Sequence, residues 1–99
     1  MCGIAGILHL DKSKNHFDKK TYRQVQEMIK LIKYRGPDAQ KVVVCPSGAM
    51  GFSHLSFIGK LSNQPIFSED GRYLFVCNGE IFNHLSLRKD LENLGHVFS

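Results

Sequence analysis

The chain begins with the stretch MCGIAGI, residues 1–7, in which Cys2 stands directly behind the initiator methionine. A methionine before so small a side chain is readily removed, so we expect Cys2 to become the first residue of the mature chain. It would then carry a thiol and a free α-amino group, and α-amino groups, with a typical pKa of about 7.7–8.0, can accept a proton near neutral pH. The alternative is a small residue that enters a first strand, and position alone slightly favours that interpretation.

The first third of the chain predicts a strand and then a helix. Residues 2–10 alternate weakly in polarity and end in a polar turn, as a strand does. The helix has Asp18 as its expected N-cap, and Gly36-Pro37 ends it soon after Tyr34. Its apolar positions recur at helical spacing and are expected to face the core: Tyr22, Val25, Met28, Ile29 and Ile32.

Three more strands are expected in the middle of the chain. Two of them, residues 41–45 and 49–58, flank a Pro-Ser-Gly turn, and a loop follows over 59–65. Asp70-Gly71 indicates a tight turn before a strand at 72–77.

The last predicted helix begins after Asn83, which can cap it, and ends before Gly95, a typical C′ residue. One face of this helix carries Leu87, Leu91 and Leu94. Residues 96–98 resemble the start of another strand. The order β-α-β-β-β-α with short loops favours an α+β fold, in which helices pack on a mainly antiparallel sheet.

Composition limits the class of protein. The 99 residues are 42% hydrophobic and 22% charged, which is typical of one small globular domain or part of one. The sequence has neither the ~18 consecutive apolar residues of a membrane span nor a signal peptide, so we expect a cytoplasmic protein without a membrane partner. The net charge is +4, but the lysines mingle with acids and lack interleaved aromatics, so nucleic acid is not an expected partner.

The cysteines and histidines do not suggest a disulfide or a metal site. Cys45 and Cys77 each close an apolar run, so both are expected to be buried strand thiols. The five histidines lack the close spacing of a zinc site, and no Cys-x-x-Cys accompanies them.

Four short motifs follow one another along the chain: MCGI at 1–4, RGPD at 35–38, QP at 64–65 and NGEIFNH at 78–84. Together they resemble the glutaminase domain of asparagine synthetase, a class II glutamine amidotransferase and N-terminal-nucleophile hydrolase. The resemblance runs over essentially all 99 residues. It implies an α+β fold of layered antiparallel sheets with flanking helices, of which residues 1–99 would be the truncated N-terminal portion. The synthetase domain is absent from this chain.

The resemblance also implies catalytic roles. Cys2 would attack the side-chain amide of glutamine, while the Asn78 side chain and the Gly79 backbone N–H would form the oxyanion hole. The residue types suit this chemistry, because glycine allows a close approach of backbone to ligand and asparagine offers an amide N–H. The alternative is a plain Asn-Gly turn, and the presence of Cys2 favours the oxyanion hole.

Three other residues match the family motifs. Glu80 corresponds to a residue that contacts the substrate near its α-amino group, although an ordinary charged turn residue is the alternative. Arg35 and Asp38 are expected to fix the loop after the helix through a local ion pair, without a catalytic role.

His54 departs from the family pattern, because the family has an arginine at this position that grips the α-carboxylate of glutamine. An imidazole cannot form the bidentate fork of a guanidinium and is largely neutral near pH 7. We therefore expect weak glutamine binding that improves at lower pH, or a shifted substrate. The other substrate-binding candidates are the backbone groups of the four residues that follow, Leu55, Ser56, Phe57 and Ile58.

A second departure is length, because the family's acidic motif and the remainder of the glutaminase domain fall after the position of Ser99. A chain that stops midway through layered sheets exposes an apolar face and open strand edges. We expect the 99 residues alone to be marginally stable, prone to associate and inactive.

The implied function is glutamine hydrolysis by Cys2, with the ammonia used to amidate aspartate to asparagine in the full-length enzyme. ATP and Mg²⁺ would serve the synthetase domain, and no cofactor is expected in this chain itself. The expected partners are glutamine, the C-terminal synthetase domain and a second copy in a homodimer. Two alternatives stay open: a degenerate amidotransferase-like module with a binding or regulatory role, and an amidotransferase that acts on another carboxylate.

Overall fold

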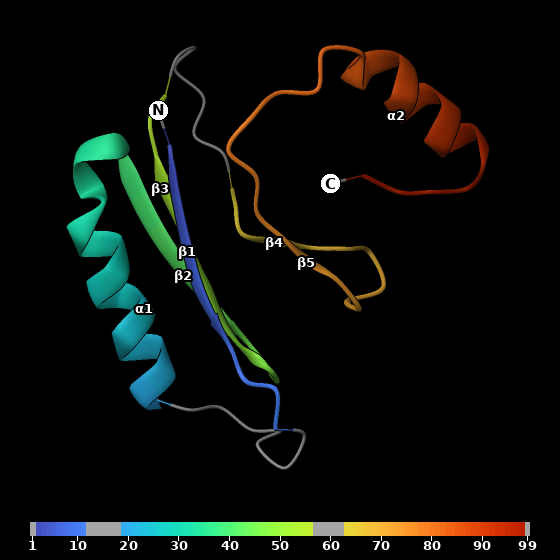
Figure 1. The fold of residues 1–99 in the computed structure, drawn as a ribbon. Helices are drawn as coiled ribbons and strands as arrows, with labels where there is room; N and C mark the ends of the chain where they lie inside the picture. The colour runs from blue at the N-terminus through green and yellow to red at the C-terminus, as the bar shows by residue number, and fades with distance from the viewer. Residues whose placement is uncertain (1, 12–18, 57–62, 99) are drawn as a thin grey trace.

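A three-stranded antiparallel sheet forms the centre of the molecule (Figure 1). The computed structural model describes residues 2–11, 19–56 and 63–98. The strands β1 (Gly3–Leu8), β2 (Ala39–Cys45) and β3 (Gly48–His54) lie in the order β1-β3-β2, so β3 is central. The hairpin of β2 and β3 is closed by the predicted turn, and β1 pairs with the other edge of β3.

Helix α1 (Lys19–Leu31) covers one face of this sheet (Figure 1). Val25 and Ile29 lie one turn apart on the helix and are buried against Ala49 of β3. Gly51 allows this contact, because a Cβ atom at its position would collide with the Ile29 side chain. Partly buried side chains complete the core: Ala5, Ile7, Met28, Ile32, Val42 and Val44.

A short turn of 3-10 helix, η1 (Lys33–Arg35), links α1 to the loop that leads into β2. The buried Ser53 hydroxyl donates a hydrogen bond of 2.6 Å to the Gly36 carbonyl. This bond holds the loop against the end of the central strand.

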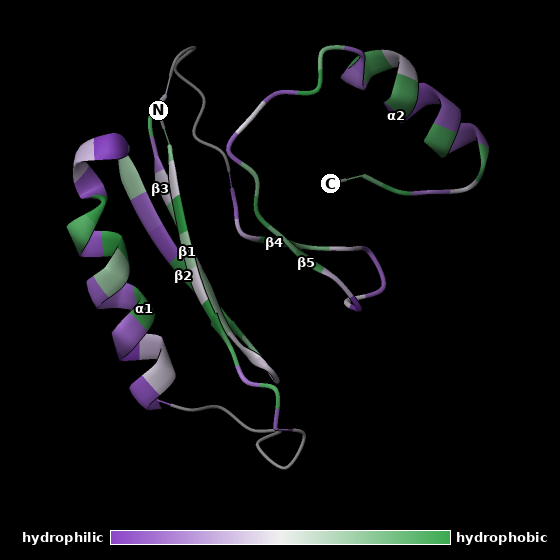
Figure 2. Ribbon diagram, viewed as in Figure 1, coloured by the Kyte–Doolittle hydropathy of each residue, from purple (hydrophilic) through white to green (hydrophobic). Residues whose placement is uncertain are grey.

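The rest of the chain lies on the other side of the sheet from α1 (Figure 1). It comprises the short hairpin of β4 (Ile66–Phe67) and β5 (Leu74–Phe75) and the helix α2 (His84–Asn93). All residues of α2 are exposed, including the predicted apolar face, whose Leu87 and Leu91 are 41% and 37% exposed. Figure 2 shows this apolar character as bands along α2.

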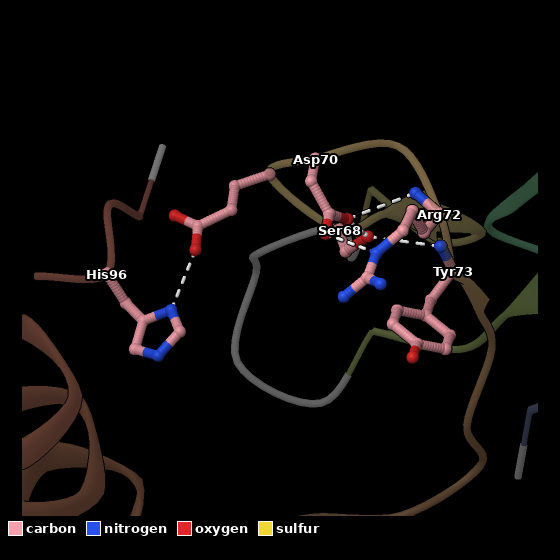
Figure 3. Close-up of polar contacts among 6 residues, drawn as sticks. Ser68, Asp70, Arg72, Tyr73 and His96 are labelled. Carbon is pink, nitrogen blue, oxygen red and sulfur yellow. Dashed lines mark hydrogen bonds and ion pairs between the residues drawn. The ribbon is translucent and has the colours of Figure 1, made fainter. Parts of the chain in front are cut away.

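Acidic side chains organise the turn between β4 and β5 (Figure 3). Asp70 accepts hydrogen bonds from the Ser68 hydroxyl and from the backbone and side chain of Arg72, at 2.7, 3.1 and 2.7 Å. These bonds hold the pKa of Asp70 below its ordinary value. The Glu69 carboxylate accepts two hydrogen bonds, from the Val97 N–H at 2.8 Å and from the His96 ring at 2.7 Å. The segment after α2 is thereby tied to the hairpin.

The structure confirms most of the predicted elements. It contains the first strand, the first helix, the β2–β3 hairpin and the second helix, and the class is α+β with antiparallel sheets. Gly95 has a φ of 97° after the C-cap Leu94, as its predicted C′ role requires. Asn83 is the N-cap of α2, but through its backbone carbonyl rather than its side chain.

Several boundaries were wrong. The second hairpin strand ends at His54 instead of Ile58, and the strand expected at 72–77 covers only Leu74–Phe75, paired with the unpredicted β4. Residues 96–98 form no strand, since Val97 donates its N–H to a carboxylate instead of a neighbouring strand. The expected N-cap Asp18 lies outside the described residues.

The two downstream cysteines are also more exposed than predicted. Cys45 ends β2 and Cys77 follows β5, and both are free and only half-buried. Each stands at the margin of a strand, where fewer neighbours cover a side chain.

We predict that Ile29→Ala lowers the free energy of unfolding by about 2–5 kcal/mol, because it leaves a cavity between α1 and the sheet. Urea unfolding followed by circular dichroism measures the change. Leu31→Ala is the matched control on the same helix, and its 77% exposed side chain should change stability by no more than about 0.5 kcal/mol. Equal losses in the two variants would contradict the assigned core.

A second prediction concerns the pH dependence of the Glu69 contacts. The Val97 N–H, and after it the His96 ring, lower the pKa of Glu69 in the folded chain below its ordinary value of 4.5. A lowered folded pKa means that the contacts stabilise the fold above pH 4.5 and are lost as the pH falls through the lower, folded value. The NMR shift of the Val97 amide should follow this titration.

Glu69→Gln provides the control for that titration, because its amide oxygen can still accept the Val97 N–H but does not ionise in this range. The acid transition of the Val97 amide should therefore disappear in the variant. A transition of unchanged size would show that another group causes it.

Candidate active site

Cys2 and His54 are brought together by the pairing of β1 with β3. Gly3 is the register partner of Ser53, so Cys2 lies across from His54 at the next position. Side chains directly opposite one another on antiparallel strands share a face of the sheet. Ser53 and Gly51 lie on the α1 face, so Cys2 and His54 lie on the face that α1 leaves uncovered.

The Cys2 thiol has three polar neighbours. The Leu55 backbone N–H donates a hydrogen bond to Sγ at 3.3 Å, and the Leu55 carbonyl oxygen lies 3.7 Å from Sγ. The third neighbour is Nδ1 of His54, at 3.8 Å from Sγ. The thiol can donate a hydrogen bond to the Leu55 carbonyl or to an unprotonated Nδ1 of His54.

The backbone carbonyl of Cys2 is held by two segments that are distant in sequence. Arg35 donates from Nε at 3.4 Å, and Asn78 donates from its side-chain amide at 3.1 Å. The RGPD and NGEIFNH motifs therefore meet at the residue of the MCGI motif that carries the thiol. Two segments that donate to one carbonyl restrict the position of the residue that carries the thiol.

The fourth motif, QP, contributes a hydrogen bond that holds the segment before Asn78. The Gln64 side-chain carbonyl accepts a hydrogen bond from the Cys77 backbone N–H at 2.5 Å. Cys77 directly precedes Asn78, so this bond positions the start of the loop whose amide reaches Cys2.

The expected ion pair between Arg35 and Asp38 was wrong, because each residue has a different partner. Arg35 holds the Cys2 carbonyl, whereas the Asp38 carboxylate accepts a hydrogen bond from the Ser56 N–H at 2.7 Å. The Asp38 N–H also donates to the His54 carbonyl at 3.0 Å. Both residues thus brace the site instead of each other, which the sequence alone did not reveal.

The predicted site residues are only partly assembled. The structure groups Cys2, His54, Leu55 and Asn78. Gly79 and Glu80 follow in the same loop and are exposed. Ser56 lies next to this group, bound to Asp38, while Phe57 and Ile58 lie outside the described residues.

Among the residues that the structure describes, no group of three or more His, Cys, Asp or Glu side chains could hold a metal ion. Neither of the α-helices in this part of the chain combines the length and the apolar character that crossing a membrane would require.

Comparison with known proteins places this arrangement in a family. A family described as a glutamine amidotransferase domain matches residues 1–99. The chain is 33% identical over 99 residues to asparagine synthetase (glutamine-hydrolyzing) 2 of Bacillus subtilis strain 168, covering 99% of this chain and 13% of that protein. It is 35% identical over 92 residues to asparagine synthetase (glutamine-hydrolyzing) 1 of Saccharomyces cerevisiae, covering 91% of this chain and 15% of that protein.

These relatives are much longer, so the chain spans only about a seventh of their length. No solved structure matches the chain. The match nevertheless covers all 99 residues, so Cys2 and the two segments that donate to its carbonyl lie within it. The chain belongs to the glutamine amidotransferase domain family and is similar over nearly its whole length to part of these glutamine-hydrolysing asparagine synthetases.

Proposed function

We propose that this chain carries the glutamine-hydrolysing chemistry of an amidotransferase, with Cys2 as the nucleophile. The observation that supports it most directly is that Arg35 and Asn78 both donate to the Cys2 carbonyl. Reactive atoms must be held in a defined geometry for covalent catalysis, and two donors from distant parts of the chain restrict the position of the residue that carries the thiol.

The reaction begins with attack of the Cys2 sulfur on the side-chain amide carbon of glutamine. The thioester forms as ammonia leaves, and water then releases glutamate. Removal of Met1 would expose the Cys2 α-amino group, which can carry a proton to the leaving ammonia.

Asn78 is the proposed side-chain donor to the oxyanion of the tetrahedral intermediate. Its amide nitrogen carries two N–H groups, and one of them donates to the Cys2 carbonyl at 3.1 Å. The second N–H and the backbone N–H of the adjacent Gly79 supply the proposed oxyanion hole.

Glutamine binding is assigned to two segments, residues 55–58 and the loop that contains Glu80. The backbone of residues 55–58 would line the pocket, and Glu80 would face the α-amino group of glutamine. At position 54 an imidazole replaces a guanidinium, so the α-carboxylate loses a bidentate partner and the proposed affinity for glutamine is weak.

The proposed fate of the ammonia rests on the names of the relatives, which are asparagine synthetases. In a longer protein, a C-terminal synthetase domain would use it with ATP and Mg²⁺ to amidate aspartate in the cytoplasm. Layered sheets of the N-terminal-nucleophile hydrolase type would complete the glutaminase domain, and a homodimer is the proposed assembly. His54 supports a second candidate, a binding module without glutaminase activity.

The first test is the mass of the longest natural form of the protein before and after incubation with a glutamine-analogue diazoketone. We expect loss of Met1 and one adduct, mapped to Cys2, because glutamine recognition should direct the electrophile to this thiol. Cys45 and Cys77 are internal controls, since both are free and half-buried like Cys2.

Cys2→Ala should abolish the adduct while leaving the circular dichroism spectrum unchanged. A processed protein that takes no adduct, or that is labelled equally at all three cysteines, would favour the binding module.

A further prediction concerns the oxyanion hole. Asn78→Ala should lower kcat for glutamate release by about 10²–10³-fold, because a donor to the developing negative charge is lost. Alkylation of Cys2 by iodoacetamide forms no tetrahedral oxyanion and is the matched control, which should change far less. Equal losses in both reactions would show that Asn78 only positions Cys2 through its carbonyl.

A further inference from the structure

The His54 imidazole is fixed in place beside the Cys2 sulfur by the sheet itself. His54 is the last residue of the central strand β3, paired with Ala39 of β2, and its carbonyl accepts the Asp38 N–H at 3.0 Å. Its ring lies 5.6 Å from the ring of Phe52, the next residue on the same face. Only 9% of His54 is exposed. The 3.8 Å between Nδ1 and Sγ is therefore a contact between two positioned groups.

A buried imidazole beside a thiol can do what an arginine at the same position cannot. A neutral imidazole accepts a proton at an unprotonated ring nitrogen, whereas a guanidinium stays protonated. Adjacent histidine activates cysteine in this way in many thiol enzymes, and an N–H donor to the sulfur adds to the effect. Here the Leu55 N–H, 3.3 Å from Sγ, is that donor.

We propose that His54 is the proton acceptor for the Cys2 thiol, so that the site contains a thiol–imidazole pair in place of an arginine that binds carboxylate. This inference rests on the proposed function of Cys2 as nucleophile. It assigns a base that is already present when the α-amino group of Cys2 is blocked by Met1.

The proposed step balances as follows. The thiol proton moves to Nδ1, and the sulfur forms a bond with the amide carbon of glutamine, whose oxygen becomes the oxyanion. As the oxyanion collapses to a carbonyl, the carbon–nitrogen bond breaks and the proton on Nδ1 passes to the departing nitrogen, which leaves as ammonia. Water then cleaves the thioester, which returns the thiol and yields glutamate.

The charged groups on the neighbouring elements have contacts of their own. Arg35 of η1 donates to the Cys2 carbonyl, and the Asp38 carboxylate before β2 accepts the Ser56 N–H. Lys41 of β2 donates to the backbone and side-chain oxygens of Asn63, each at 3.2 Å. Among the described residues named here, His54 is thus the one whose ring nitrogen contacts the Cys2 sulfur.

The test compares two electrophiles on the longest natural form of the protein. Iodoacetamide has neither the α-carboxylate nor the α-amino group of glutamine, so it reports on the thiol alone, whereas the diazoketone also requires glutamine recognition. The variant is His54→Asn, whose side-chain amide can occupy the place of Nδ1 without accepting a proton. His84→Asn, at the exposed start of α2, is the matched control.

For His54→Asn, we expect the rate of iodoacetamide alkylation at Cys2 near pH 6.5 to fall about tenfold or more, and its rise with pH to move upward by about one unit. The maximal rate with the diazoketone should fall at least as much. His84→Asn should match the wild type with both reagents. Unchanged alkylation rates at Cys45 and Cys77 would show that the variant is folded.

Two results would overturn the inference. If His54→Asn keeps the wild-type iodoacetamide profile but needs more diazoketone for half-maximal labelling, His54 binds the carboxylate of glutamine and the proposed function of Cys2 stands. If neither reagent distinguishes the variant from the wild type, His54 has no role at the thiol. A third result would separate the two proposals. If the wild-type protein takes no diazoketone adduct, but His54→Asn still moves the iodoacetamide profile to higher pH, then the thiol–imidazole pair is supported and the proposed glutaminase function is contradicted.

If His54→Asn does not fold, NMR titration of the His54 ring in the wild type and in Cys2→Ala decides the question. A pair requires that removal of the thiol changes the titration of the ring. Identical titrations in the two proteins would overturn the inference.

Discussion

The register between β1 and β3 is the constraint on which both the core and the site depend. A slip of one residue would turn every β1 side chain to the opposite face of the sheet. Packing on the face covered by α1 opposes such a slip, because Ile32, the residue after α1, lies so close to Gly3 that a side chain at that position would collide with it. The same register sets Gly3 against Ser53 and so places Cys2 opposite His54. Hydrophobic packing on one face thus fixes the chemistry on the other.

Alternate residues of β3 face opposite sides of the sheet, so one set packs in the core and the other lies at the candidate site. Ala49, Gly51 and Ser53 lie on the α1 face, where small side chains let the helix approach closely. The Ser53 hydroxyl there holds the loop that follows η1. Phe52 and His54 lie on the opposite face, where the aromatic ring supports the imidazole. A strand of seven residues therefore contributes to stability and to the candidate site without a conflict between them.

The sequence predicts what is set by local pattern. The helical spacing of Val25 and Ile29 and the strong turn residues between β2 and β3 gave the right elements, because periodicity and turn chemistry act over a few residues. The lengths of β4 and β5 depend on how the two strands pair with each other, and local propensity does not encode this pairing.

The candidate site shows the same division. The motifs identify Cys2 and Asn78, but the contact of His54 with the thiol requires the register of two strands that are 52 residues apart at this point. Arg35 was expected to pair with its near neighbour Asp38, and only the folded arrangement reveals that a backbone carbonyl is its acceptor. Cys77 follows an apolar run in the sequence, which predicted a buried side chain, but it lies just beyond the end of β5 and is only half-buried.

The hold on Cys2 acts through its backbone and leaves its side chain free to change. Arg35 and Asn78 grip the carbonyl oxygen, which takes no part in any bond that the sulfur makes or breaks. The proposed change from thiol to thiolate and thioester would therefore leave the two hydrogen bonds to the carbonyl in place. The proposed covalent intermediate would be held by the same two donors as the free thiol, and its hydrolysis would leave the sulfur in its original position.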